Sequence, residues 1–400
     1  MPEDLPPAPP LWAVQNLAPP VRLTDVRIDG IAVEAGMPGN TVKIMARGHT
    51  TTDEPLFHLA TKGLAGIIAD RARVAGAFVR PDQSNCLLVV IHADYTADLW
   101  DDTAAIAHNV LAKKPFQPGQ PVFEGDIADI IGMRFNAVEI LPTDKVICIF
   151  REGWRFALFV DFNSSGNFKL LEMERDLGTL VRRMRYADLY DAVANDALFG
   201  KVIEAGWFPF VEIIGAEFTE LLNQSKAGFP LADVESKLLA KFDKARIEHL
   251  LERWMGRPHF AAKKPLLDSA MKAFQNGDPV AVLKIVLTEI EGILNDAYFL
   301  KTGRRTSKIQ KLLAFAIESA ETRAGSPDTL LFPAAFGRYL RDYVFRSFDP
   351  AQGGGEAGSR HAVGHGAAEA GTYTMIRALQ ALLTLDQLAF YTAADPMAPT

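Results

Sequence analysis

Residues 278–300, DPVAVLKIVLTEIEGILNDAYFL, repeat apolar side chains at intervals of three and four, which is the spacing of an α-helix with one buried face. Asp278 before Pro279 is a typical helix start, because the aspartate accepts a backbone hydrogen bond and proline is tolerated at the first helical position. Gly303 is suited to end the helix, since glycine readily takes the left-handed conformation. This stretch therefore predicts a long helix with a broad apolar face.

Apolar side chains recur at helical spacing in further segments after Asn167, whereas strand signals stop there. These segments are residues 169–194, 211–224, 230–242, 244–255, 264–277 and 372–391. We therefore predict an all-α C-terminal half, made of a helical connecting region over 166–245 and a helical bundle domain over 246–400. The last helix is expected at the centre of the bundle, with six largely buried side chains: Met375, Ile376, Leu379, Leu382, Leu383 and Phe390.

The chain before residue 166 mixes strand and helix signals. Residues 146–162, VICIFREGWRFALFVDF, predict a β-hairpin, because two apolar runs flank a short polar turn that contains Gly153. Trp154, Phe156 and Phe159 are expected to pack in its core. Residues 96–114 predict a helix, since their acidic side chains come early and their lysines late. Strands are predicted in four further segments: 21–28, 42–48, 75–81 and 85–93.

Residues 21–165 are thus predicted to form a mixed α/β domain with a β-hairpin, and the whole chain belongs to the α+β class. Hydrophobic residues make up 48% of the 400 residues, which suffices for sizeable cores and exceeds the content of disordered chains. The net charge of −7 argues against a protein that coats nucleic acid over its whole surface.

The expected compartment follows from what the sequence lacks. Cys86 and Cys148 lie in apolar runs without zinc spacing, which favours buried thiols in a reducing compartment. The Pro-rich residues 1–20 are expected to form a flexible tail and do not resemble a signal peptide. No run approaches the roughly 18 apolar residues of a membrane span. We therefore expect a cytoplasmic protein that does not contact membranes.

Residues 359–366, SRHAVGHG, place an arginine and two histidines beside glycines. Ser359 is suited to cap a helix that starts at Arg360, and His361 and His365 then lie on one face. Arginine offers a permanently charged fork for phosphate, and histidine exchanges protons near neutral pH. Together they are the minimum for cleaving RNA without a metal, because a base assists the attack of the 2′-hydroxyl and a cation stabilises the phosphorane.

These residues alone leave two alternatives open. The two histidines are spaced to begin a zinc site, with Glu369 as the nearest further candidate, but no third ligand follows at a suitable spacing. The motif is also compatible with a purely structural role, since such side chains often satisfy backbone groups at a helix start.

The motif Arg360-x4-His365 resembles that of the HEPN superfamily, in which an arginine is followed after four to six residues by a histidine. The sequence around it, 358–388, and the upstream helix KIVLTEIEGILNDAY (284–298) look like C-terminal HEPN-type domains of bacterial proteins. The resemblance covers roughly the last 150 residues. One departure is His361, because the family frequently has Asn or Asp after the arginine.

The resemblance implies a metal-independent endoribonuclease without a cofactor, in a toxin–antitoxin, CRISPR-associated or phage-defence context. Such proteins commonly act as homodimers with two motifs facing each other, so RNA, a second copy and a separate antitoxin or regulatory protein are the expected partners. Arg360 would stabilise phosphate charge, His365 would act as general acid or base, and His361 would assist. Other members are catalytically silent modules that bind RNA or nucleotide or serve as dimerisation scaffolds.

Two further sets of charged residues are candidates for supporting roles. Glu289 and Asp296 fall at the edge of the apolar arc of the long helix, where they either reach solvent at the rim or orient Arg360 or His365. Between residues 241 and 350, 18 Lys and Arg stand against 13 Asp and Glu. The densest basic cluster is expected to bind RNA, unless it is an ordinary solvated helix face: Arg304, Arg305, Lys308 and Lys311.

Overall fold

The computed structural model describes residues 15–347 and 355–393 and divides the chain into two compact units. The N-terminal unit contains the described residues up to Asn109 together with Ile130–Ala187, and the helical unit contains Val110–Asp129 and the chain from Asp188 onward. The expected boundary at residue 165 therefore falls inside the N-terminal unit. The expected connecting region is likewise shared between the two units, and most of it belongs with the later helices.

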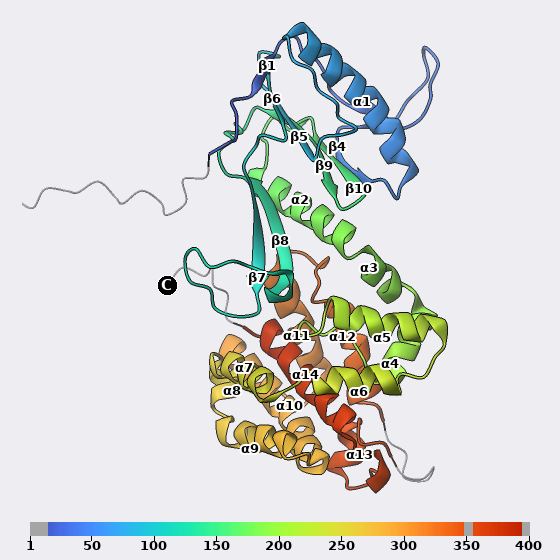
Figure 1. Cartoon of the computed structure of the whole chain (residues 1–400), viewed down its shortest axis with the longest axis vertical. Helices are drawn as coiled ribbons and strands as arrows, with labels where there is room; N and C mark the ends of the chain where they lie inside the picture. Colours follow the sequence, from blue (N-terminus) through green and yellow to red (C-terminus); the bar gives the residue numbers. More distant parts are fainter. Residues whose placement is uncertain (1–14, 348–354, 394–400) are drawn as a thin grey trace, which may run out of the picture. The chain divides into compact units, whose positions relative to one another are not determined.

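The N-terminal unit is built on a six-stranded antiparallel sheet in the order β1-β6-β5-β9-β10-β4 (Figure 1). Its strands are β1 (Val21–Leu23), β4 (Arg47–Thr51), β5 (Cys86–Ile91), β6 (Ala97–Asp101), β9 (Lys145–Glu152) and β10 (Arg155–Asp161). Two small two-stranded sheets pair β2 (Ile31–Ala32) with β3 (Ile44–Met45), and β7 (Ile106–Ala112) with β8 (Ile127–Phe135). The chain passes between the two units within the β7–β8 ribbon.

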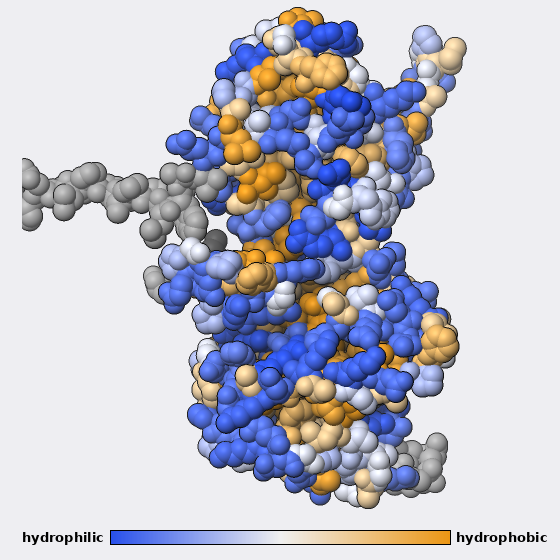
Figure 2. All heavy atoms as spheres, viewed as in Figure 1, coloured by the Kyte–Doolittle hydropathy of each residue, from blue (hydrophilic) through white to orange (hydrophobic). Residues whose placement is uncertain are grey.

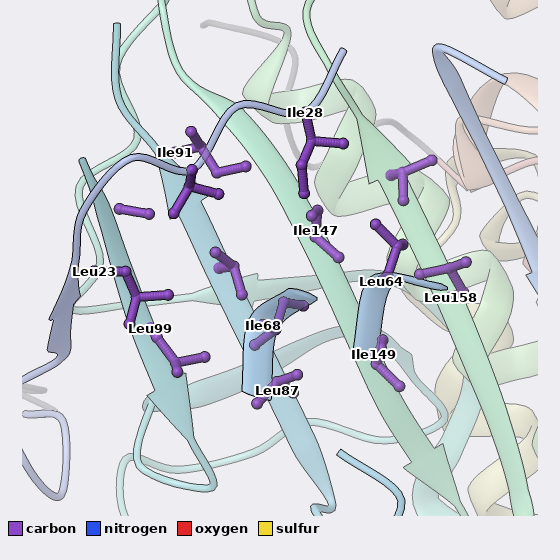
Figure 3. Packing of buried hydrophobic residues seen from close by; sticks show 14 of the residues in the cluster. Leu23, Ile28, Leu64, Ile68, Leu87, Ile91, Leu99, Ile147, Ile149 and Leu158 are labelled. Atoms are coloured by element: carbon purple, nitrogen blue, oxygen red, sulfur yellow. The ribbon is translucent and has the colours of Figure 1, made fainter. Parts of the chain in front are cut away.

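Helices cover both faces of the six-stranded sheet. Helix α1 (Pro55–Val74) buries Leu64 and Ile68 against one face, which presents alternate strand residues such as Leu87 and Ile147 (Figure 3). Neighbouring strand residues point to the opposite face, where α2 (Leu170–Arg185) packs across β4, β9 and β10. Helices therefore cover both faces of the sheet, and β5, an inner strand between β6 and β9, is buried along its whole length.

Two expectations for this unit are wrong, and one helix was not predicted. Residues 96–114 form strands β6 and β7 and not a helix, because β6 pairs with both β1 and β5 and cross-strand burial outweighs the helix-like charge pattern. Residues 75–81 contain no strand. Helix α1 was not predicted, because exposed apolar side chains such as Leu59 and Val74 obscure the helical spacing of its buried residues.

Residues 1–14 of the expected flexible tail lie outside the described residues. The described remainder of that segment is fixed by Asn16, whose side-chain amide donates to the Ala137 carbonyl at 2.9 Å and accepts from the Ala105 amide at 2.8 Å. The segment next to β1 is therefore attached to the N-terminal unit and is not a free tail.

The expected β-hairpin is confirmed as β9 and β10, which pair directly across a turn with Gly153 at φ 63°. Phe159 is buried at 1% exposure, and Phe156 is half-buried against the core below α1. Trp154, however, is 70% exposed, with the Arg155 guanidinium 4.2 Å from its ring centroid. The expectation that Trp154 packs in the core is wrong, because Trp154 lies in the turn, beyond the last paired residues of both strands.

We expect Trp154→Ala to change the free energy of unfolding by no more than about 0.5 kcal/mol, as is usual for an exposed surface position. Phe159→Ala in the adjoining strand is the matched comparison and should cost about 3–5 kcal/mol, because it empties a buried site. Urea denaturation of both variants, followed by circular dichroism, measures the difference. Equal losses for the two variants would contradict the burial described for this hairpin.

The helical unit confirms the all-α character expected for the second half of the chain. Its helices are α3 (Ala187–Ala194), α4 (Asp196–Glu204), α5 (Ala216–Ala227), α6 (Ala232–Ala240), α7 (Lys244–Met255), α8 (Pro258–Ala261), α9 (Lys264–Gln275), α10 (Pro279–Thr302), α11 (Ile309–Ala324), α12 (Pro333–Tyr339), α13 (Arg360–Gly364) and α14 (Met375–Tyr391). Helix α10 starts and ends as expected, with the Asp278 side chain accepting from the Ala281 amide and Gly303 at φ 68°.

Helix α14 is buried along most of its length and packs against α10, α11, α6 and α7. Four of the six side chains expected in the core are buried, whereas Met375 and Ile376 in the first turn are half-buried. Buried polar side chains also lie on this helix. Gln380 donates to the Ala205 carbonyl at 2.9 Å, and Gln387 accepts from the Val211 amide at 2.8 Å. Helix α14 therefore joins distant segments by hydrogen bonds as well as by apolar packing.

Hydrophilic side chains cover most of the visible surface of the helical unit, with small apolar patches between them (Figure 2). Within the described ranges, none of the helices combines the length and apolarity needed to cross a membrane.

Candidate functional site

The motif expected to carry chemistry lies on the one-turn helix α13, which starts at Arg360 as expected. The Ser359 hydroxyl accepts from the Ala362 amide at 3.5 Å and donates to the Arg346 carbonyl at 3.0 Å, which attaches the helix start to the preceding segment. Gly358 lies against the Tyr343 ring, and a Cβ atom there would come within 2.4 Å of the Tyr343 hydroxyl. The backbone around the motif is therefore held in place by close packing.

The turn after α13 places His365 at the protein surface. His365 ends the helix, with its amide bonded to the His361 carbonyl at 3.0 Å. Gly366 follows at φ 69°, a conformation that favours glycine, and lets the Ala367 amide bond to the Ala362 carbonyl at 2.8 Å. Gly366 thus has a structural reason for its place in the motif, which the sequence alone did not supply.

Arg360 forms an ion pair with Glu291 of α10, with 2.6 Å between a guanidinium nitrogen and the carboxylate. The two side chains are 30% and 26% exposed, so the pair is accessible from solvent at its rim. The Nε atom of Arg360 is buried, and no group in the described part of the chain accepts a hydrogen bond from it. Arg360 is therefore oriented by one carboxylate while part of its donor set remains unused.

Both histidines of the motif belong to the same short helix as Arg360, His361 inside it and His365 at its end. His361 interacts electrostatically with Arg360, His365 and Glu291, so the four side chains form one cluster. Burial, together with the Arg360 charge, lowers the pKa of His361 below its usual value, and its imidazole is neutral at neutral pH. His365 is exposed. The cluster thus holds a fixed cation, a neutral imidazole and an accessible imidazole.

The carboxylates expected to orient the motif lie elsewhere. Glu289 pairs with Lys263 at 2.9 Å, and Asp296 pairs with Arg305 at 2.7 Å. The carboxylate that contacts Arg360 is instead Glu291, which falls opposite the apolar arc when residues 279–300 are projected as a helix at about 100° per residue. A projection assigns faces of one helix and does not show which other segment will pack on each face, so the partner was missed.

The expected RNA-binding cluster lies in and around the loop between α10 and α11, and all four of its side chains are exposed: Arg304, Arg305, Lys308 and Lys311. The loop is attached to α10 through Asn295, which donates to the Thr306 carbonyl at 2.8 Å and accepts from its amide at 3.1 Å. Asn295 stands one helical turn after Glu291, and residues four apart are neighbours on a helix surface. The basic loop and the Arg360 cluster are therefore anchored on the same face of α10.

Two aromatic side chains accompany this basic cluster and were not singled out in the sequence. The guanidinium of Arg305 lies 4.9 Å from the ring centroid of Phe299, which is 42% exposed, and the Lys311 ammonium lies 5.6 Å from the ring of Tyr298. An exposed ring beside cations is the combination on which single-stranded nucleic acids stack. The sequence signal for this combination is the adjacent pair Tyr298 and Phe299, shortly before the basic segment.

Among residues 15–347 and 355–393, no three His, Cys, Asp or Glu side chains gather closely enough to hold a metal ion. No model of a known protein family matches the chain, and comparisons with curated proteins and with solved structures find no similar protein. The resemblance to HEPN domains consequently rests on the motif and its surroundings in the sequence.

Proposed function

We propose that the chain is a metal-independent endoribonuclease whose catalytic residues are Arg360, His361 and His365. The observation that carries the proposal is their joint placement: Arg360 is oriented by Glu291, a neutral imidazole lies beside it, and a second imidazole is exposed on the same turn. The exposed basic loop on the same face of α10 suits the RNA backbone. Single-stranded or looped RNA is the proposed substrate, because its bases are free to stack on Phe299.

In the proposed reaction the 2′-oxygen bonds to the adjacent phosphorus while the bond from phosphorus to the next 5′-oxygen breaks. One imidazole accepts the proton of the 2′-hydroxyl, and another donates a proton to the leaving 5′-oxygen. His365 serves as general acid or base because it is accessible, and the lowered pKa of His361 suits it to assist by accepting a proton. Arg360 stabilises the negative charge that develops on the phosphoryl oxygens.

The test is cleavage of a labelled single-stranded RNA by the purified full chain, with and without EDTA. We expect cleavage that survives EDTA and gives 2′,3′-cyclic phosphate and 5′-hydroxyl ends. Arg360→Ala and His365→Ala should each lower the rate by a factor of about 100 or more, as loss of general acid–base or electrostatic catalysis does. Arg360→Lys should restore little, because an ammonium does not reproduce the planar fork. His361→Asn should be the mildest change.

Arg341→Ala and His58→Ala are matched controls, since both side chains are exposed and lie outside the cluster. Growth inhibition on expression, lost with His365→Ala, extends the test to a protein that needs a cellular partner. EDTA-sensitive cleavage, or wild-type cleavage by a folded Arg360→Ala/His365→Ala double variant, would contradict the proposal. The proposal also includes a homodimer in which the two motifs face each other. The molar mass of the protein in solution tests this part of the proposal.

The second candidate is a catalytically silent HEPN module that binds RNA or nucleotide. The ion pair with Glu291 favours it, because a carboxylate at 2.6 Å offsets part of the positive charge that a phosphate would need. A gel-shift assay without cleavage products distinguishes this candidate from the nuclease. Binding should then weaken on charge removal at Arg304 and Arg305, and remain after His365→Ala.

A further inference from the structure

A concave site lies in the helical unit and shares no lining residue with the motif at Arg360. It is a cavity of about 540 Å³ formed by the end of β7, the following loop, α7 and α14. This volume is within the range of pockets that hold small molecules. Its lining contains five Lys and Arg side chains against three carboxylates, an excess of two positive charges. The sequence showed no motif here, because the residues come from segments far apart in the chain.

Three of the five cations already have carboxylate partners. Arg246 contacts both Glu212 and Glu217 at 2.9 Å. Arg253 contacts Glu212 at 2.9 Å and the buried Asp386 at 2.6 Å. Lys114 pairs with Asp126 at 2.6 Å. These pairs form the walls of the cavity and supply little free positive charge.

Lys113 and Arg257 differ from the other three cations. Lys113 is half-buried, and within the described part of the chain its ammonium group has no hydrogen-bond or ion-pair partner. Among the described residues, Arg257 has one hydrogen-bond partner, the Ala389 carbonyl, which accepts from its Nε atom at 3.3 Å. Burial lowers the pKa of both side chains, because their charged forms lose part of their hydration. An anionic ligand would offset that cost.

We propose that this cavity binds a small phosphate-bearing molecule, with Lys113 and the free guanidinium nitrogens of Arg257 as its phosphate ligands. A guanidinium fork and a flexible ammonium are the two side chains that bind phosphate best, one by paired hydrogen bonds and the other as a point charge. The limited volume of the cavity suits a compact anion better than a polymer, whose backbone needs a continuous exposed track. The site is separate from Arg360 and does not depend on nuclease activity.

Calorimetric titration of the full chain with pyrophosphate, ATP and adenosine at physiological ionic strength tests this site. Pyrophosphate and ATP should bind with one-to-one stoichiometry, and adenosine should not bind. Equal affinities for the two phosphate compounds would identify the phosphate chain as the recognised group, whereas tighter binding of ATP would identify a nucleotide. Lys113→Met/Arg257→Met should weaken both phosphate ligands by at least about tenfold, because it removes two charge-assisted contacts.

Lys113→Met alone is the variant less prone to unfold, since within the described residues the Lys113 ammonium group has no hydrogen-bond or ion-pair partner to lose, and it should also weaken binding. Lys272→Met and Arg341→Met remove exposed cations elsewhere and should leave affinity unchanged. Arg360→Ala/His365→Ala should bind both phosphate compounds like the wild type, so that failure of the nuclease proposal and failure of this one are distinguishable. Three outcomes would overturn the site: no saturable binding, unchanged affinity in the folded Lys113→Met/Arg257→Met variant, or loss of binding in Arg360→Ala/His365→Ala.

Discussion

Leu379→Asp should unfold the helical unit or lower its free energy of unfolding by several kcal/mol. Leu379 is fully buried on α14, the helix that packs against four others. A carboxylate at this position would lose its hydration without gaining an ion-pair partner. Such burial costs several kcal/mol. That is a large share of the roughly 5–15 kcal/mol by which proteins are usually stable.

Leu300→Asp is the matched control, because it makes the same chemical change at a side chain that is 60% exposed on α10. It should leave the urea midpoint close to that of the wild type. Circular dichroism at 222 nm reports mainly the helical unit and is the suitable probe. A soluble Leu379→Asp protein with the wild-type midpoint would show that α14 is not the centre of this unit.

Arg253→Met should destabilise the helical unit by about 3–5 kcal/mol at neutral pH, as loss of one partner of a buried ion pair does. Arg253 is the cation that contacts Asp386, which is 1% exposed and otherwise accepts a hydrogen bond from the Trp254 indole at 2.9 Å. Burial raises the pKa of Asp386 to about 6, and Arg253 partly opposes that rise. Without Arg253 the carboxylate would remain buried and unpaired.

The pH dependence separates this charge effect from lost packing. The folded pKa of Asp386 lies above the ordinary value of 3.8 for an aspartate, so protonation stabilises the folded state and the advantage is lost as pH rises through about 6. Arg253 opposes the rise in the pKa of Asp386, so its loss should raise that pKa further, and the deficit of Arg253→Met relative to the wild type should shrink as pH falls from about 7.5 to about 6. Arg253→Met/Asp386→Asn should regain most of the stability and lose this pH dependence. A pH-independent deficit would assign the effect to packing alone.

Helix periodicity and helix ends were predictable where local interactions decide them. The start of α10 at Pro279 and its end at Gly303 follow from the bond of Asp278 to the backbone and from the left-handed glycine, both within one turn. The hairpin around Gly153 was predictable for the same reason. The motif at Arg360 was found because its residues follow one another within a short helix and its end, so their proximity depends on local structure.

The misassigned strands show where local reasoning ended. Residues 96–114 carry a charge pattern suited to a helix, but β6 pairs with β1 and β5, which come from elsewhere in the chain. Trp154 looked like a core residue by its type, and its position in a turn exposed it. In both cases the deciding interaction, or its absence, depends on which surfaces the completed sheet presents.

By itself the sequence determined the α+β class, the long helices of the second half, the β9–β10 hairpin and the clustering of Arg360 with His361 and His365. Only the tertiary structure decided that Glu291 pairs with Arg360, that Asp386 is buried beside Arg253, and that Lys113 and Arg257 share a cavity. The physical reason is the range of the interactions. Backbone hydrogen bonds and side-chain periodicity act within a turn or a hairpin, whereas these charges meet only after distant helices pack and exclude water.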